Sequence, residues 1–174
     1  MTDLVTVQFH VNGKPVNTAV PTDLPLVDFL QDELRLSGTR LCCGIGVCKA
    51  CTVAARRVPS SQAQPMLACS TPVALLQGQS ITTIEGTGSI EQPSKIQQAF
   101  LDHFAFQCGY CTPGFVMATE MLLERLRAQP VARDQLDAAI ENAVGQHICR
   151  CTGYARYHQA IRAVVLAEKG LVKA

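Results

Sequence analysis

The sequence has few charged residues and no long apolar segment. Asp, Glu, Lys and Arg make up 17% of the 174 residues, below the roughly 25% of an ordinary soluble domain, while apolar residues reach 48%. Lys plus Arg is 15 and Asp plus Glu is 14, so no excess of basic residues points to nucleic acid. No run approaches the roughly 18–20 apolar residues that span a bilayer. The composition therefore predicts a folded chain whose sparse charge suggests a surface partly covered by a protein partner.

Two cofactor motifs and a leader are also missing. No GxGxxG motif occurs, so we expect no dinucleotide site in this chain, and no CxxCH motif occurs for covalent haem attachment. The first residues lack the basic and continuous apolar regions of a signal peptide. We therefore expect a cytoplasmic protein, unless a partner with an export signal carries the folded complex to the periplasm.

Cysteine is the residue present in excess, with nine copies. An odd number argues against a complete set of intramolecular disulfides. Without a signal peptide, a reducing compartment is expected, where disulfides are rare. Many cysteines in such a compartment indicate a metal site.

The first half has the periodicity of strands around one helix. Alternating apolar residues followed by Asn12-Gly13 predict a hairpin. Helical spacing over Pro25–Leu36 predicts a helix that ends near Gly38. A surface loop is expected at Pro59–Pro65. The strands expected are Leu4–Val11, Val16–Val20, Thr52–Val58 and Ser80–Ile84.

The second half has helical periodicity. Gly86–Pro93 is rich in Gly, Ser and Pro and predicts a linker. Thr112-Pro113 predicts a helix N-cap followed by proline in the first turn. The other helical segments expected are 96–104, Asp134–Val144 and Tyr154–Glu168. Four helices in so short a segment make a small bundle. We therefore expect an α+β chain with two domains, residues 1–85 and 86–174.

The first cysteine set is Cys43, Cys48, Cys51 and Cys69. Its C-x4-C-x2-C spacing, followed by a distant cysteine, is the pattern of plant-type two-iron ferredoxins. Gly44 and Gly46 let the loop bend so that backbone N–H groups face the cluster sulfurs. The neighbours Leu41, Ile45 and Val47 are apolar and would exclude water. Zinc, which favours two C-x-x-C pairs, and disulfides are the alternatives.

The second set is Cys108, Cys111, Cys149 and Cys151. Each pair falls between two predicted helices, and antiparallel helix pairs would bring both turns to one end of the bundle. Helix N-termini at Thr112 and Thr152 would then direct positive dipole ends at an anionic cluster. This spacing alone would also suit zinc. The ninth cysteine, Cys42, is expected to be a small buried residue, with a reactive thiol as the alternative.

Three ordered motifs resemble the iron–sulfur subunit of the molybdenum hydroxylases, the xanthine dehydrogenase and aldehyde oxidoreductase family. They are GTRLCCG (38–44) with CKACTV (48–53), FQCGYCTPG (106–114) and CRCTGY (149–154). The resemblance covers essentially the whole chain. It implies an N-terminal β-grasp domain of the plant-type ferredoxin kind, holding an outer 2Fe-2S cluster on the first cysteine set. It further implies a C-terminal four-helix bundle holding an inner 2Fe-2S cluster on the second set.

In that family the inner cluster lies against the pterin of a molybdenum cofactor, which a large catalytic subunit binds. The resemblance implies that Gln107 hydrogen-bonds the pterin and that Cys151 approaches its amino group. A helix-end amide that bonds local backbone is the alternative for Gln107. The implied function is electron transfer from the partner's molybdenum centre, which oxidises an aldehyde or an N-heterocycle, to an FAD-binding or cytochrome c subunit. No catalytic residue is expected in this chain itself.

The chain departs from the family pattern at three places. Cys42 stands where glycine is usual, His147-Ile148 stands where Asn-Leu is common, and Pro59–Pro65 lengthens the interval before the fourth cysteine. We expect His147 to pack at the surface, with a contact to the inner cluster or the pterin as the alternative. The insertion is expected to decorate the surface or to touch a partner.

Two other functions use part of the same pattern. A free-standing ferredoxin-like shuttle would need only the first cysteine set and is usually acidic, whereas this chain has a formal charge of +1. A zinc-stabilised interaction module would use the thiols without redox chemistry and would be colourless.

Overall fold

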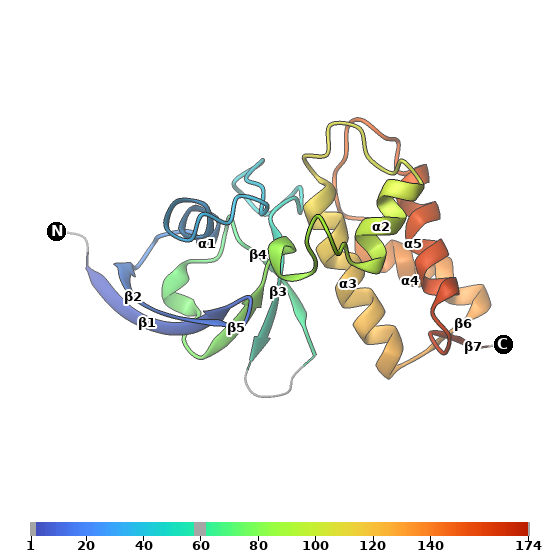
Figure 1. Cartoon of the computed structure of the whole chain (residues 1–174). Coiled ribbons are helices and arrows are strands. Elements are labelled where there is room, and N and C mark those ends of the chain that lie inside the picture. Colours follow the sequence, from blue (N-terminus) through green and yellow to red (C-terminus); the bar gives the residue numbers. More distant parts are fainter. Residues whose placement is uncertain (1–2, 58–61, 174) are drawn as a thin grey trace.

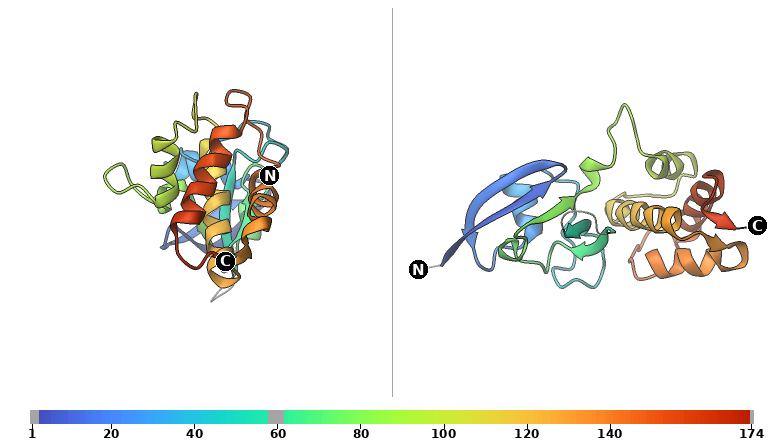
Figure 2. Two further views of the ribbon diagram at one scale, coloured as in Figure 1. Left: turned by 90° about the vertical axis from the view of Figure 1, so that its right-hand side faces the viewer. Right: turned by 90° about the horizontal axis from the view of Figure 1, so that it is seen from below.

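The structure is a computed structural model, which describes residues 3–57 and 62–173. It has a half rich in strands and a half made of helices (Figure 1). β1 and β7 lie at opposite ends of the molecule in Figure 1 and in the right-hand view of Figure 2. The fold is therefore mixed, with a sheet followed by several helices, as the periodicity predicted.

The described residues of the first half form a mixed five-stranded sheet. Its strands are β1 (Leu4–Val11), β2 (Lys14–Pro21), β3 (Thr52–Arg57), β4 (Gln64–Leu67) and β5 (Gln79–Thr82). Their order across the sheet is β2-β1-β5-β3-β4. β1 pairs in parallel with β5, whereas the other neighbours are antiparallel. The predicted hairpin is confirmed, with Asn12 and Gly13 turning the chain at φ values of 50° and 79°.

The helix of the first half is shorter and less regular than predicted. α1 (Leu26–Asp28) continues as a π-helical turn at Phe29–Glu33. The helix ends there because Arg35 adopts a left-handed conformation, with φ at 57°, instead of ending near Gly38. Its apolar side chains pack on the sheet, and the rings of Phe9 and Phe29 lie 5.9 Å apart. This packing forms the hydrophobic cluster of the first half.

The region after β3 differs from the predicted surface loop. Gln64 and Pro65 begin the strand β4 instead. Proline is tolerated there because β4 is the edge strand of the sheet. Residues 58–61, which include the predicted end of β3 and part of the predicted loop, lie outside the described residues.

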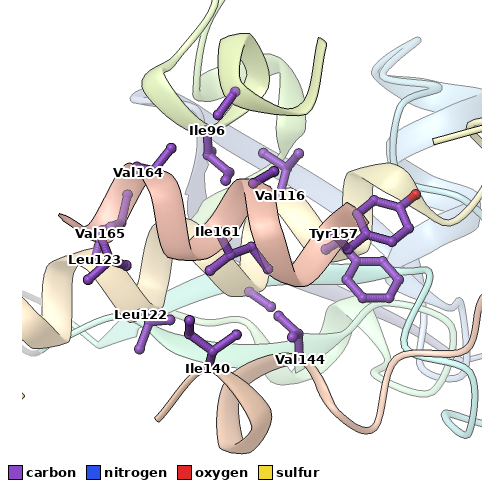
Figure 3. Close-up of a cluster of buried hydrophobic side chains, with 14 of the residues drawn as sticks. Ile96, Val116, Leu122, Leu123, Ile140, Val144, Tyr157, Ile161, Val164 and Val165 are labelled. Atoms are coloured by element: carbon purple, nitrogen blue, oxygen red, sulfur yellow. The ribbon is translucent and has the colours of Figure 1, made fainter. Parts of the chain in front are cut away.

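The described part of the second half contains four helices. They are α2 (Lys95–Asp102), α3 (Thr112–Ala128), α4 (Leu136–Val144) and α5 (Ala155–Ala167). Ser94 and Gln97 form a capping box that begins α2. Figure 3 shows Ile96, Leu122, Ile140 and Ile161, one from each helix, meeting in a second hydrophobic cluster. No helix in residues 3–57 and 62–173 is long and apolar enough to cross a membrane.

Three helix ends differ from the prediction. α2 ends at Asp102, and Phe104, which was expected on its apolar face, has a φ of 49° and is 73% exposed. Cys111 occupies the N-cap of α3, so Thr112 lies in the first turn. α5 begins after Tyr154, which adopts a left-handed φ of 69°. A short parallel pair, β6 (Val131–Ala132) with β7 (Val172–Lys173), was not predicted.

The helix α3 joins the two halves. It lies beside β3 and β4 (Figures 1 and 2), and its Met117 and Met121 pack with Ala54 and Ala63 of the first half. A Cβ atom added at Gly114 would lie 2.5 Å from the carbonyl oxygen of Lys49, so the backbones approach closely here. The two halves therefore share a packed contact.

Candidate metal centres

The outer cysteine loop connects the π-helical turn to β3. Gly44 and Gly46 have φ values of 70° and 74°, a left-handed conformation that glycine adopts without strain. The Cys48 N–H lies 3.4 Å from Cys43 Sγ. Hydrogen bonds from the backbone of Cys48, and then of Ile45, lower the pKa of the Cys43 thiol to about 6. The loop thus directs amides at sulfur, as the glycine positions predicted.

The four thiols of the first set come together as two pairs. Cys43 and Cys48 are hydrogen-bonded through their side chains. Cys51 and Cys69 form the second pair, and the Cys69 N–H also lies 3.5 Å from Cys51 Sγ. Burial raises the pKa of Cys51 to about 12. Cys51 also interacts electrostatically with Cys48, which connects the two pairs.

The surroundings of this set differ from the expectation. Ile45 and Val47 are 73% and 56% exposed, so within this chain they form an apolar rim and do not shield the thiols. Cys42 is exposed rather than buried, although Cys43 beside it faces the loop interior. The prediction of a small buried residue at Cys42 is therefore wrong.

The loop between α2 and α3 lies beside the loop between α4 and α5 (Figure 1), and these two loops carry the second set of cysteines. The Sγ atoms of Cys108 and Cys151 lie 3.6 Å apart. Cys111 and Cys149 are hydrogen-bonded through their side chains. The prediction that both turns lie at one end of the helices is confirmed, and these thiols also form pairs.

Polar groups beside the second set act on its thiols. Burial raises the pKa of Cys149, but hydrogen bonds from the Thr152 hydroxyl and amide, the Cys151 backbone and the Cys111 side chain together lower it. The Thr152 Oγ1 lies 3.2 Å from Cys149 Sγ. α3 begins directly after Cys111, one residue earlier than predicted, whereas α5 begins only at Ala155. Thr152 therefore acts through its own donors and not as a helix N-terminus.

Gln107 lies at the exposed edge of the second set. Its Nε2 donates a hydrogen bond of 2.9 Å to the carbonyl oxygen of Cys151, which joins the two loops. Cys108 and Cys151 are exposed, whereas Cys149 is buried. The second set therefore has one open side, formed by Gln107 and these two cysteines.

His147 is buried, so its predicted packing at the surface is wrong. Its side chain lies between the halves, with Nε2 3.4 Å from Thr52 Oγ1 and its ring 5.1 Å from that of Phe115. Burial lowers the pKa of His147 to about 4. Within the described residues its Nδ1 has no hydrogen-bond partner.

Contacts between the two cysteine loops were not predicted. The Ile148 N–H donates to the carbonyl oxygen of Cys48 at 3.0 Å. The Tyr110 hydroxyl donates to the carbonyl oxygen of Leu41, and the Arg40 guanidinium lies 5.7 Å from the Tyr110 ring. No sequence spacing indicates these contacts, because they join residues that only the tertiary fold brings together.

The donor chemistry of both sets fits a two-iron cluster better than a single ion. The eight thiols lie in pairs, and a 2Fe-2S cluster takes two thiolates at each of its irons.

Comparisons with known proteins agree with this chemistry. Residues 9–74 match a 2Fe-2S iron-sulfur cluster binding domain, and residues 83–162 match a second 2Fe-2S binding domain. The chain is 37% identical over 157 residues to one of the subunits of nicotinate dehydrogenase from Pseudomonas putida, covering 90% of this chain and 92% of that protein. The chain belongs to the iron–sulfur subunits of the molybdenum hydroxylases.

The same iron–sulfur subunit resembles longer proteins. It is 40% identical over 152 residues to aldehyde oxidase 4 of Cavia porcellus, covering 84% of this chain but 11% of that protein. Its fold matches quinoline 2-oxidoreductase from Pseudomonas putida 86 with a TM-score of 0.79 at 31% identity, over 94% and 95% of the two chains. The aldehyde oxidoreductase of Desulfovibrio desulfuricans matches with a TM-score of 0.80 at 29% identity, over 97% of this chain and 18% of that one.

Proposed function

We propose that this iron–sulfur subunit transfers electrons within a molybdenum hydroxylase complex. Electrons leave a molybdenum centre on a large catalytic partner, pass through this chain and reach an FAD-binding or cytochrome subunit. The observation that carries the proposal is the meeting of eight thiols in two sets of paired sulfurs, joined by direct contacts between their loops.

In this proposal residues 1–85 are a β-grasp domain and residues 86–174 are a four-helix domain. The strand order β2-β1-β5-β3-β4, with α1 packed on the sheet, supports the first assignment. The two main hydrophobic clusters support the division, because one consists of buried residues up to Ile81 and the other starts at Ile96.

The ligands follow from the sulfur pairs. The outer cluster takes Cys43 with Cys48 at one iron and Cys51 with Cys69 at the other. The inner cluster takes Cys108 with Cys151 and Cys111 with Cys149. When bound, a 2Fe-2S cluster supplies one-electron exchange. The chain holds these sulfurs, hydrogen-bonds them and buries some of them, and these are the factors that set a cluster's potential.

The open side of the second set is the place where the pterin of the molybdenum cofactor would approach. Gln107 and Cys151 line it. The side-chain Nε2 of Gln107 donates to the Cys151 carbonyl oxygen, and this bond does not involve the side-chain Oε1 of the same amide. The pterin-facing role of Gln107 therefore coexists with its bond to the Cys151 carbonyl oxygen.

An N-heterocycle is the substrate class that we propose for the catalytic partner. The two similar proteins that this chain matches over 92% and 95% of their length are named for nicotinate and quinoline. The longer relatives, over which this chain covers 11% to 18% of the length, include proteins named for aldehydes and for xanthine. This chain therefore spans nearly the whole of the chains named for nicotinate and quinoline, which favours N-heterocycles over aldehydes as the substrate class.

Anaerobic purification of the full chain tests the proposal. We expect roughly four irons per chain, visible absorption and two distinct EPR signals after reduction. Cys108→Ser should remove one signal and leave the other. A colourless protein that contains zinc would contradict the electron-transfer function. Native mass spectrometry should show a large molybdenum-containing partner, and a chain that always occurs alone would favour the free-standing shuttle.

A further inference from the structure

The contact between the two halves has a part beside the cysteine loops. Gly114, near the start of α3, packs against the backbone of Lys49 and Ala50. The Ile148 N–H donates to the Cys48 carbonyl oxygen at 3.0 Å in the same region. These contacts hold the cysteine loops together at one end of α3. Farther along the helix, Met117 and Met121 pack on Ala54 and Ala63, but apolar packing is not directional and fixes the tilt of the helical half less sharply than hydrogen bonds do.

A second part of the contact lies farther along α3, at Glu124. Arg56 of β3 donates two hydrogen bonds of 2.6 Å each, one to each carboxylate oxygen of Glu124. The Ala63 N–H donates to Glu124 Oε1 at 3.3 Å. Ala63 is 6% exposed and packs with Met117 and Met121. One carboxylate of the helical half therefore binds β3 and the residue just before β4.

The two parts are well separated along the helix. Glu124 lies ten positions after Gly114, and an α-helix rises about 1.5 Å per residue, so the separation is roughly 15 Å. A rigid helix that is fixed at two such points cannot pivot on the sheet. Most isolated surface ion pairs add little, but a bidentate arginine–carboxylate pair also fixes geometry.

We propose that Glu124 is a positioning residue that fixes the angle between the two halves and hence the separation of the two cluster sites. The inference rests on the proposed function, because it concerns clusters that the thiols would hold. The contact also concerns the insertion before Cys69, which was expected to decorate the surface or to touch a partner. Gln62 and Ala63, in its described part, lie beside α3 of the same chain. Because electron tunnelling falls steeply with distance, a fixed angle keeps the transfer rate constant.

The test compares Glu124→Gln with Glu168→Gln in the full chain loaded with both clusters. Glu168 is a matched control, because it also binds an arginine but lies entirely within the helical half, where it pairs with Arg127 and Lys95. The first readout is the magnetic interaction between the two reduced clusters, seen as splitting of their EPR lines. The second is hydrogen exchange of the amides of Ala63 and β4, which does not depend on the clusters.

We expect Glu124→Gln to keep both EPR signals and the wild-type iron content. The splitting should broaden or shrink, and the amides of Ala63 and β4 should exchange roughly tenfold faster. Glu168→Gln should leave the splitting at its wild-type value and change the exchange of these amides much less than Glu124→Gln does. Arg56→Lys, which keeps the charge but loses the two-point geometry, should give an intermediate change and replaces Glu124→Gln if that variant does not fold.

Wild-type splitting and wild-type exchange in Glu124→Gln would overturn the positioning role. Equal changes in both glutamine variants would also overturn it, because they would show a general loss of stability. A wild-type chain without iron would instead contradict the proposed function, and the exchange measurement would still decide whether Glu124 holds the halves together.

Discussion

Gly44 and Gly46 both hold a left-handed backbone in the outer cysteine loop, but their surroundings differ. A Cβ added at Gly46 would lie 3.2 Å from Leu67 Cδ1 and 3.3 Å from Ser70 Oγ, whereas no described atom lies within 4 Å of one added at Gly44. Alanine at either position costs about 1–2 kcal/mol of backbone strain. Gly46→Ala adds tight contacts with Leu67 and Ser70 beside Cys69, so we expect it to lose the outer cluster faster than Gly44→Ala.

The measurement is the rate at which the outer EPR signal decays in the two variants under the same mild denaturant. Gly44→Ala is the matched control, since it carries the same backbone strain without tight contacts to neighbouring side chains. Equal decay rates would show that the contacts of Gly46 with Leu67 and Ser70 do not matter for the loop.

The adjacent residues Cys42 and Cys43 provide a second test at this scale. Cys42 is exposed, and Cys43 is paired with Cys48. We expect Cys42→Gly to keep both clusters, because glycine restores freedom to the loop without removing a ligand. Cys43→Ser should lose the outer EPR signal and about half of the iron. Loss of the outer signal in Cys42→Gly would show that the assignment of these two cysteines is wrong.

Side-chain burial was the property that sequence predicted least well. The short cysteine spacings predicted which thiols share a loop, and the helical pattern predicted that the two loops of the second set meet. It could not predict that His147 is buried, because that burial depends on Thr52 and Phe115, which approach it only in the folded molecule. Phe104 fits a helical pattern but is exposed, since the chain leaves the helix two residues earlier.

At the scale of elements, Glu168 connects the ends of three helices. It follows α5 and pairs with Arg127 in the last turn of α3 and with Lys95 at the start of α2. Hydrogen bonds from Arg127, and then from Lys95, lower the pKa of Glu168 to about 2. A lowered pKa stabilises the fold fully above the ordinary value of 4.5, and this stabilisation is lost as the pH falls towards 2.

We therefore expect Glu168→Gln to reduce the free energy of unfolding by about 1 kcal/mol at pH 7, a modest value because the partners are partly exposed. The difference from wild type should shrink as the pH falls below 4.5. Urea unfolding followed by circular dichroism at several pH values measures it. A difference that stays constant from pH 7 to pH 3 would contradict the ion-pair explanation.

The elements that sequence predicted are those with several repeats of one period. The alternation of β1 and the helical spacing of α4 and α5 gave nearly the observed bounds. β4, β6 and β7 span two to four residues each, too short for a periodic signal, and they form by pairing with distant segments. The π-helical turn after α1 likewise depends on packing against the sheet rather than on local propensity.

At the scale of the whole molecule, the members of the two cysteine sets could be predicted from the sequence, whereas the contacts between the two cysteine loops could not. Each set has a characteristic spacing, but the Tyr110–Leu41 contact joins residues 69 positions apart. Such contacts depend on how α3 crosses the sheet, and that crossing is determined by a few small residues. Gly114 is the clearest of them, because a side chain there would meet backbone atoms.

Substitution of Gly114 by alanine tests this crossing, because the sign of its effect on the free energy of unfolding depends on how closely α3 packs against Lys49. Glycine to alanine inside a helix normally stabilises a protein by about 1 kcal/mol. Here the new Cβ would lie 2.5 Å from the Lys49 carbonyl oxygen and 3.1 Å from the Ala50 Cα. Overpacking of this kind costs about 1–3 kcal/mol, so we expect Gly114→Ala to lower the free energy of unfolding.

Urea unfolding of the full chain shows whether Gly114→Ala lowers or raises the free energy of unfolding. Ala138→Gly, at an exposed position of α4, is the control for helix propensity and should cost about 1 kcal/mol. The Gly114→Ala variant should also show faster hydrogen exchange at the Ile148 amide, because α3 must move away from the outer loop. A stabilised Gly114→Ala variant would mean that the halves do not pack as closely at Lys49 as the structure shows, and the rigid relation between the two cysteine sets would then have to rest on other contacts.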